Sequence, residues 1–381
     1  MMHLSLQESM YHQNNIIIIG NSVVEHSKSL IKLNKRVINI DSFNDDDLKG
    51  ECYLNKNSFG FVNDDVIEII KKLNLKKEDT IIIVASGFDT KRDYDENLNK
   101  YGYLANNKQD IFAETKYSKI LFNQLYKSGI KVPKDYNLEI LNKEKKLIKN
   151  KDLSGGFGIK DYTKDYILAD NEYIQEFITG NVHSILFIVN KKKDYKLIGI
   201  NKIFNKKTKN TNYCFSGAIS NIKLEPPYIE LLKNIINFFV NNFDLVGING
   251  IDFVIKGSSI YFLEINPRLT QTCFMYDDYF KLGYVNAHID SIIDGKMPDI
   301  VNEENSSYAF ETIFAKEDFK YTFDLLKYDF VSNVPKTNCF IEAGDPICTI
   351  RVKSYDEKKA DKLLSDNISL IKNELNNTEI I

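Results

Sequence analysis

The segment that most constrains the fold is GINGIDFVIKGSSIYFLEINPRLTQT, at residues 247–272. Two apolar runs flank the turn sequence Lys256-Gly257-Ser258-Ser259, a pattern that predicts a β-hairpin. Side chains two residues apart on a strand point to the same face, so Glu264 and Asn266 share one face. Pairing about the turn places Asp252 opposite that pair. Three oxygen-bearing side chains are therefore expected to converge on one face of an otherwise apolar hairpin.

These side chains suit a metal ion. Carboxylates that lie together repel one another unless a positive charge sits between them. Mg²⁺ is the expected cation for Asp252, Glu264 and Asn266, with Mn²⁺ as the alternative, because Mg²⁺ prefers hard oxygen ligands and keeps positions free for phosphate. Arg268 follows on the same side and can hold a phosphate or a carboxylate through paired hydrogen bonds. The alternative is an ordinary hairpin with solvated acids, which the apolar flanks disfavour.

A glycine-rich segment, KKLIKNKDLSGGFGIK, lies upstream at residues 145–160. A short strand is expected to end at Lys149, which can reach phosphate oxygens as a point charge. Glycines let the backbone approach phosphates closely and direct N–H groups at them. The candidate phosphate-binding loop comprises Ser154, Gly155, Gly156 and Gly158. The P-loop pattern is absent, and a mobile turn is the alternative interpretation.

A third segment, YIQEFITGNVHSILFIV at residues 173–189, reads as two strands, 173–178 and 184–189, broken at Gly180. A strand edge with polar backbone groups and apolar side chains can receive an adenine ring, and a histidine nearby can bind phosphate or ribose. The candidate nucleotide-binding residues here are Gln175, Glu176, Phe177, Ile178 and His183. The alternative is a plain hairpin whose polar side chains face water.

The N-terminal part of the chain alternates strands and helices. Strands are expected at 16–19, 37–40 and 80–85, with helices between them. This order predicts a parallel sheet with ligand loops at its carboxyl edge, where Asp41 and Ser86-Gly87 end strands. A dinucleotide site is the alternative, but only one glycine of G-x-G-x-x-G is present.

The rest of the chain predicts a mixture of helices and strands. A helix is expected at about 115–128, short strands to about 265, more strands at 310–314 and 346–352, and a final helix from near Asp356. No repeat and no Pro- or Ser-rich linker is present, so closely packed domains are expected. We predict an α/β domain at 1–108, an α+β domain at 109–300 and a C-terminal α+β region at 301–381 packed on the core.

The composition restricts the classes of molecule that this chain is expected to bind. Fifty basic against 53 acidic residues give a net charge of −3, too small to attract nucleic acid or an anionic membrane. No apolar stretch approaches the length of a membrane span, and the N-terminus lacks a signal-peptide pattern. The five cysteines show no CxxC pairing and no clustering with histidine, which disfavours disulfides and zinc. A cytoplasmic protein that acts on small molecules is expected.

These segments, in this order, resemble the ATP-grasp superfamily from about residue 14 to the C-terminus, with the specific motifs at 145–270. In biotin carboxylase and its relatives, two metal-binding acids on neighbouring strands are followed by E-x-N and an arginine. Asp252, Glu264, Asn266 and Arg268 match that pattern, including the separation of the acids (264 − 252 = 12). The resemblance implies that the first three hold Mg²⁺ between ATP phosphates, and that Arg268 binds substrate or steadies transition-state charge.

The resemblance extends to the ATP contacts. It implies two α+β lobes that clasp ATP, with Lys149 and the 154–158 loop on the phosphates and the strand Glu176-Phe177-Ile178 on the adenine. A second ATP-binding lysine is usual at the start of the preceding helix. Lys116 and Lys119 bracket that place, and the sequence does not choose between them.

Within the superfamily, the chain resembles a group labelled ATP-dependent carboligases, found in archaea and methylotrophs. The motifs that carry this likeness are IDSFNDDD at 40–47, QEFITG at 175–180, NGIDF at 249–253, LEINPR at 263–268 and AGDPICTI at 343–350. Some relatives, among them tyramine–glutamate ligase, make the C1-carrier cofactors methanofuran and tetrahydromethanopterin. The resemblance therefore implies an ATP-dependent carboxylate–amine ligase that forms an acyl phosphate and ADP, with a homodimer as the expected oligomer.

Three alternatives stay open. A biotin-carboxylase-like enzyme would activate bicarbonate, and a bicarbonate requirement would reveal it. A non-catalytic nucleotide-binding protein would keep the fold without turnover. An α/β oxidoreductase is disfavoured by the missing dinucleotide fingerprint.

Overall fold

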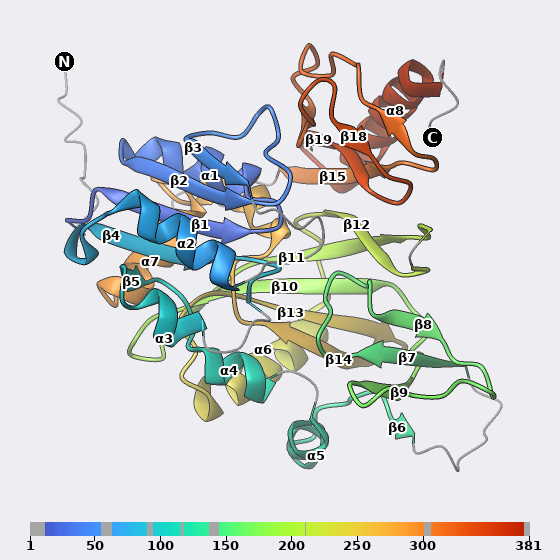
Figure 1. The fold of residues 1–381 in the computed structure, drawn as a ribbon. Coiled ribbons are helices and arrows are strands. Elements are labelled where there is room, and N and C mark those ends of the chain that lie inside the picture. Colours follow the sequence, from blue (N-terminus) through green and yellow to red (C-terminus); the bar gives the residue numbers. More distant parts are fainter. Residues whose placement is uncertain are drawn as a thin grey trace.

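The computed structural model describes residues 12–54, 63–89, 94–115, 118–136, 145–209, 211–300 and 306–376. A parallel N-terminal sheet, a large antiparallel sheet and a smaller four-stranded sheet form the body of the molecule (Figure 1). The expected α/β and α+β architecture is therefore confirmed. None of the described helices is both long enough and apolar enough to span a membrane.

The N-terminal sheet is parallel and has the strand order β3-β2-β1-β4-β5. Its strands are β1 (Asn15–Gly20), β2 (Arg36–Asp41), β3 (Glu51–Leu54), β4 (Thr80–Val84) and β5 (Tyr103–Leu104). The helices among them are α1 (Val24–Leu30), α2 (Asn63–Leu73) and α3 (Tyr94–Leu98). Every residue of β1 and β4 is buried, because a parallel sheet is covered on both faces. The three strands predicted here are confirmed, whereas the short edge strands β3 and β5 are not apparent from the sequence.

The helix expected at about 115–128 is confirmed as α5, but it begins at Lys119, and a separate helix precedes it. The two helices are α4 (Gln109–Thr115) and α5 (Lys119–Lys127). Ser118 is extended, at φ −139° and ψ 146°, and its hydroxyl caps α5 by accepting a hydrogen bond from Leu121 N. The predicted end is confirmed, since Gly129 follows α5 at φ +79°.

A four-stranded antiparallel sheet has the order β6-β9-β7-β8. Its strands are β6 (Asp135–Tyr136), β7 (Lys146–Asn150), β8 (Ile159–Asp161) and β9 (Glu172–Glu176). The glycine-rich segment therefore connects β7 to β8, as a strand ending near Lys149 predicts. β9 ends at Glu176, two residues before the end expected from the sequence.

The large antiparallel sheet runs through the middle of the molecule in the order β14-β13-β10-β11-β12-β15-β19-β17. Its first five strands along the chain are β10 (Val182–Val189), β11 (Tyr195–Lys206), β12 (Cys214–Ile219), β13 (Gly247–Lys256) and β14 (Ser259–Asn266). The helix α6 (Pro226–Asn242) packs on one face with α5. The 3-10 helix η3 (Gln271–Tyr279), α7 (Tyr284–Ile293) and the N-terminal sheet pack on the other.

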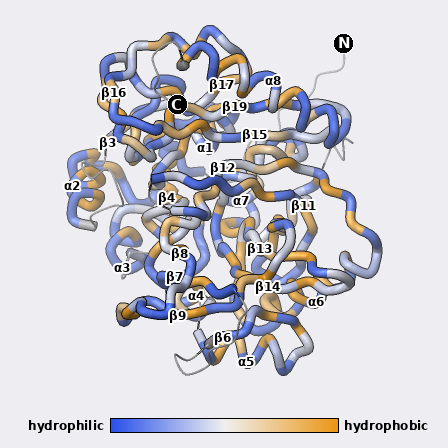
Figure 2. The backbone as a smooth tube through the Cα atoms, turned by 90° about the vertical axis from the view of Figure 1, so that its right-hand side faces the viewer, coloured by the Kyte–Doolittle hydropathy of each residue, from blue (hydrophilic) through white to orange (hydrophobic). Residues whose placement is uncertain are grey.

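The C-terminal strands extend the same large sheet. They are β15 (Ser307–Phe314), β17 (Val331–Ser332) and β19 (Pro346–Ser354), with α8 (Glu357–Asn376) packed on β15 and β19. A hairpin of β16 (Phe319–Lys320) and β18 (Phe340–Ile341) completes this region. The C-terminal elements lie at the top and β6, β9 and α5 at the bottom in two views a quarter-turn apart (Figures 1 and 2). The boundaries at 108 and 300 stay predictions, and the third region shares its sheet with the second.

Candidate active site

The acidic hairpin forms as predicted. Asp252 of β13 lies directly opposite Glu264 of β14, and Asn266 lies opposite Gly250. The side-chain amide of Asn266 donates to Asp252 Oδ2 at 3.3 Å, which confirms the expected convergence of the three side chains. A register shift next to Asp252 places Phe253 opposite Phe262, and both rings are buried in the core beneath the hairpin.

The electrostatics of this cluster favour a bound cation. Burial raises the pKa of Asp252 well above its usual range, and the charge of Glu264 adds to the rise. Burial also holds the pKa of Lys149 below its usual value, although the charges of Glu264 and Asp252 oppose this. The two facing carboxylates are hard oxygen donors, which fits Mg²⁺. Asn266 turns its Nδ2 to Asp252 and its Oδ1 to Arg268, so its oxygen would join the ion only after the amide turns over. In the described part of the chain no group of three His, Cys, Asp or Glu side chains could hold a metal ion. The remaining Mg²⁺ ligands would therefore come from phosphate or water.

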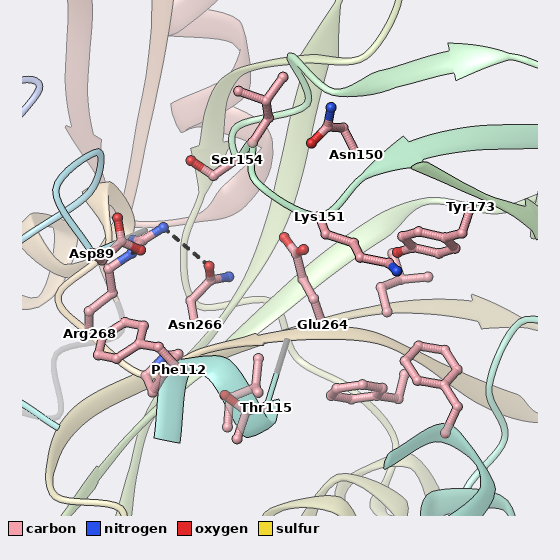
Figure 3. Close-up of a pocket in the computed structure, with 16 residues that line it drawn as sticks. Asp89, Phe112, Thr115, Asn150, Lys151, Ser154, Tyr173, Glu264, Asn266 and Arg268 are labelled. Carbon is pink, nitrogen blue, oxygen red and sulfur yellow. Dashed lines mark hydrogen bonds and ion pairs between the residues drawn. The ribbon is translucent and has the colours of Figure 1, made fainter. Parts of the chain in front are cut away.

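Arg268 lies next to the acids and is buried. Its Nε donates to Asp89 Oδ2 at 2.6 Å, and its guanidinium also donates to Asn266 Oδ1 at 3.2 Å (Figure 3). Asp89, Arg268, Asn266 and Glu264 all line one cavity, with Ser154 and Lys151 on its other side. The structure thus brings Arg268 to the acidic cluster, as the sequence predicts.

The glycine loop rests on the turn between β11 and β12. Phe215 N donates to Gly155 O at 3.0 Å, and Thr211 Oγ1 donates to Gly156 O at 2.8 Å. Gly155 and Gly156 have φ of +66° and +83°, in the left-handed region that favours glycine. A Cβ on Gly156 would lie 1.8 Å from Tyr213 O. Gly158 follows at the start of β8, where its carbonyl accepts from Asn150 N.

The predicted adenine-binding strand is β9 and the residues after it. Tyr173 of β9 pairs with Lys149 of β7 and lines the cavity. Gln175 is two residues from Tyr173 and so shares its face, and its Nε2 is buried without a partner in the described structure. An unpaired buried donor beside the cavity fits a nucleotide, whose base would accept its hydrogen bond.

The other residues of this segment are held by their neighbours. The Glu176 carboxylate accepts from Lys134 N at 3.1 Å. Phe177 lies under the ammonium of Lys145, 4.6 Å from the ring centroid. Ile178 is buried. None of the three is among the residues that line the cavity, and the adenine contact expected of them stays a prediction.

His183 is not brought to the acidic cluster. Its neighbour Ser184 pairs with Asp252 across the sheet, so His183 points to the opposite face. There its ring stacks on Phe253 with 5.5 Å between centroids, and burial lowers its pKa. The prediction that His183 contacts phosphate at the acidic site is therefore wrong, because side chains alternate along β10 and His183 lies on the other face.

The second ATP-binding lysine, Lys116 or Lys119, stays a prediction. Lys119 starts α5 and its ammonium lies 3.7 Å from the Asp135 carboxylate, on an exposed surface. Lys116 lies outside the described residues.

Asp89 and Tyr173 line the cavity and are not predicted as site residues. The sequence signal for Asp89 is the strand end at Ser86-Gly87, three residues upstream. Its pairing with Arg268 joins residues 179 positions apart, which no local pattern reveals.

Comparison with known proteins agrees with this geometry. A family model described as an ATP-grasp domain matches residues 113–272. An uncharacterized protein of Methanocaldococcus jannaschii is 32% identical over 130 residues, which are 33% of this chain and 32% of that protein. The match thus spans about a third of either chain.

Solved structures share the fold at low sequence identity. An L-amino acid ligase from Bacillus licheniformis has a TM-score of 0.66 at 10% identity, covering 93% of this chain and 96% of that one. Biotin carboxylase from Campylobacter jejuni, solved as a β,γ-ATP complex, has a TM-score of 0.64 at 12% identity, covering 91% and 89%. Residues 113–272 therefore form an ATP-grasp domain, and the chain as a whole shares the fold of these solved structures.

Proposed function

We propose that the protein is an ATP-dependent ligase that joins a carboxylate to an amine through an acyl phosphate and releases ADP and phosphate. The observation that carries the proposal is the pair of facing carboxylates Asp252 and Glu264, which lie beside Lys149 and Arg268. Such an arrangement stabilises phosphate charge on one side and a carboxylate on the other.

The reaction proceeds in two balanced steps. A carboxylate oxygen attacks the γ-phosphorus of ATP, the bond from that phosphorus to the ADP oxygen breaks, and an acyl phosphate forms. The amine nitrogen then attacks the carbonyl carbon, loses a proton, and expels phosphate. Mg²⁺ held by Asp252, Glu264 and Asn266 would neutralise charge on the phosphate oxygens, and Mn²⁺ could replace it.

The side chains divide the work. Lys149 places its ammonium near Glu264 and Asp252, where it offsets phosphate charge. Arg268 orients the substrate carboxylate with the N–H donors that are not used in its contacts with neighbouring residues. Gln175, together with the segment 176–178, receives the adenine.

The glycine loop protects the intermediate. An acyl phosphate exposed to water would hydrolyse, so the loop at 154–158 must close over the reacting groups. Its contacts with Thr211 and Phe215 supply a seat for the closed position. The carboxyl edge of the N-terminal sheet, at Asp41 and Ser86-Gly87, contributes to the acceptor pocket.

The finer proposal is a cytoplasmic homodimer that acts on small molecules in the synthesis of a C1-carrier cofactor. Its support is the sequence likeness of the motifs at 175–180 and 263–268 to the carboligase group. Nucleic acid and membrane are not among the proposed partners.

The test follows release of ADP and phosphate from Mg·ATP against a panel of amino acids, amines, other carboxylates and bicarbonate, with mass spectrometry of the products. We expect ADP release that requires one carboxylate and one amine, together with the condensed product. Failure of every pair to stimulate turnover, with nucleotide binding that survives Glu264→Gln, would favour a non-catalytic nucleotide-binding protein.

A bicarbonate-activating enzyme is the second candidate. The likeness to biotin carboxylase over 91% of this chain supports it. The same panel separates the two, because this candidate requires bicarbonate for ADP release and needs no second carboxylate.

A further inference from the structure

Arg268 is held by three different partners. Its Nε donates to Asp89 Oδ2 at 2.6 Å, Nη1 donates to Leu269 O at 3.3 Å, and Nη2 donates to Asn266 Oδ1 at 3.2 Å. A guanidinium has five N–H donors in a rigid planar fork. These contacts, within the described residues, therefore leave two N–H donors on its two terminal nitrogens.

The only charged group among these partners is Asp89, which comes from the N-terminal domain. The side chains of Asp89 and Arg268 are 5% and 7% exposed, so the ion pair is shielded from water. A buried pair of this kind is costly to break, because the remaining charge is left without compensation. Asp89 thus restrains the plane of the guanidinium more strongly than the two neutral carbonyl acceptors do.

Asp89 is itself fixed in a tight turn. Its Oδ1 accepts from Gly87 N at 2.8 Å, so its two carboxylate oxygens have different partners. Gly87 has φ +102°, and a Cβ there would lie 2.3 Å from Asn21 Oδ1. The turn after β4 therefore packs against the end of β1, and this packing fixes the position of the Asp89 carboxylate relative to Arg268.

The arrangement also sets the amide of Asn266. Arginine can only donate, so the atom of Asn266 that faces it is the oxygen. The amide nitrogen then faces Asp252, as the 3.3 Å contact has it. A continuous chain of hydrogen bonds thus leads from Asp89 through Arg268 and Asn266 to Asp252. Figure 3 shows its link between Arg268 and Asn266.

We propose that Asp89 is a positioning residue for the ligase reaction. It holds Arg268 from the N-terminal domain so that two guanidinium N–H donors are presented to the substrate carboxylate. Asp89 acts through Arg268, and this inference rests on the proposed function.

The experiment combines kinetics with an arginine spectrum. The chain has four arginines, Arg36, Arg92, Arg268 and Arg351, so their ¹⁵N-labelled Nε–H signals are few, and an Arg268→Lys variant assigns the one of interest. Asp89→Asn keeps an acceptor oxygen without the charge, and Asp89→Ala removes both. The matched control is Asp277→Asn, whose carboxylate also ties the N-terminal domain to the ATP-grasp domain by accepting from Ser29 at 2.6 Å.

In the intact protein the Arg268 Nε–H signal should exchange slowly with water, because the group is buried and hydrogen-bonded. We expect it to shift and to exchange at least about tenfold faster in both Asp89 variants, since a charge-assisted bond is roughly twice as strong as a neutral one. With the active substrate pair, the KM for the carboxylate should rise about tenfold or more, while the KM for Mg·ATP changes less than about threefold. The Asp277→Asn control should leave the signal and both KM values unchanged.

An Arg268 signal that is unmoved in Asp89→Ala overturns the proposal, as does a KM for the carboxylate that stays at its original value. Absence of turnover in the intact protein would instead count against the proposed function. In that case acetate with Mg·ADP is the carboxylate probe. The Arg268 signal should then respond to acetate in the intact protein and not in Asp89→Asn, and equal responses in both proteins overturn the proposal.

Discussion

Glu264 and Asp252 are held face to face on neighbouring strands, and their repulsion makes this arrangement unfavourable until a cation joins them. We predict that Glu264→Gln lowers turnover at least about 100-fold, because the phosphate-side charge is no longer compensated. Its melting temperature without ligand should be equal or higher, since the repulsion between two facing carboxylates is removed. Mg·ATP should stabilise the variant less than the original protein.

Thermal melting with and without Mg·ATP, together with turnover, checks this prediction. The control is Glu311→Gln in β15, on the same sheet but paired with Lys206. It should keep full turnover. A Glu264→Gln protein with normal activity would contradict the metal-ligand assignment.

At the residue scale, the sequence predicts which side chains share a face of a strand, because side chains alternate along it. Glu264, Asn266 and Asp252 could be placed on one face from their spacing alone. The same alternation, applied to β10, sends His183 away from Ser184 and the acids, and the sequence gives no register from which to see this. Asp89 was beyond prediction, because its role depends on a contact with Arg268 across the two domains.

At the scale of elements, the glycine loop offers a comparison between neighbours. Gly155 and Gly156 both have positive φ, so alanine is strained at either position. A Cβ on Gly155 meets only the Phe157 ring, at 3.6 Å, whereas a Cβ on Gly156 lies 1.8 Å from Tyr213 O. We predict that Gly156→Ala displaces the loop from its seat and lowers kcat/KM for ATP about tenfold more than Gly155→Ala does. Steady-state kinetics of the two variants decides this. Equal losses of kcat/KM would show that the close packing of Gly156 on Tyr213 O has no part in loop closure.

Elements that are long and buried were predictable, and short or interrupted ones were not. The apolar runs of β1 and β4 are buried on both faces, which gives a strong pattern. β5 has two residues at the edge of its sheet, too few for any periodicity. The break before α5 depends on the conformation of Ser118, a cap that the surrounding apolar pattern conceals.

At the scale of the whole molecule, hydrogen bonds of Asp47 connect the N-terminal domain to the C-terminal region. Its carboxylate accepts from Lys28 at 2.6 Å, from Ser332 Oγ at 3.0 Å and from Val334 N at 3.0 Å. Asp47→Ala removes the acceptor of the Val334 N–H and leaves Lys28 with only one of its two carboxylates, Glu25, so we predict a loss of about 1–3 kcal/mol in the free energy of unfolding. The exposed pair of Arg36 and Glu51 is the control, where Glu51→Gln should cost less than about 1 kcal/mol. Urea unfolding checks both, and similar costs for the two variants would contradict a structural lock at Asp47.

A buried histidine joins the domains and makes stability depend on pH. His288 Nδ1 accepts from Ile248 N at 2.9 Å and Nε2 donates to Ala105 O at 3.0 Å, so the ring is neutral. Burial lowers its pKa to about 4 from 6.5. Between these values the unfolded chain binds a proton that the folded chain does not, so stability is full above about pH 6.5 and falls towards pH 4, by on the order of 3 kcal/mol.

Urea unfolding between pH 7.5 and pH 5 measures this loss. His288→Gln is the matched variant, because its amide offers one acceptor and one donor without titrating. We predict a smaller pH dependence in this variant than in the original protein. His26 is also buried with a pKa lowered to about 3, so part of the dependence should remain. An unchanged pH dependence in His288→Gln would contradict the assignment.

The most direct test of the central claim follows oxygen from substrate to phosphate. If the carboxylate is activated as an acyl phosphate, one of its oxygens leaves with the phosphate when the amine attacks. With the carboxylate substrate identified by the panel and labelled with ¹⁸O, we predict that the phosphate released alongside ADP carries one ¹⁸O atom. Glu264→Gln should release this phosphate at least about 100-fold more slowly. Unlabelled phosphate, or release of AMP in place of ADP, would contradict activation of the carboxylate by γ-phosphoryl transfer.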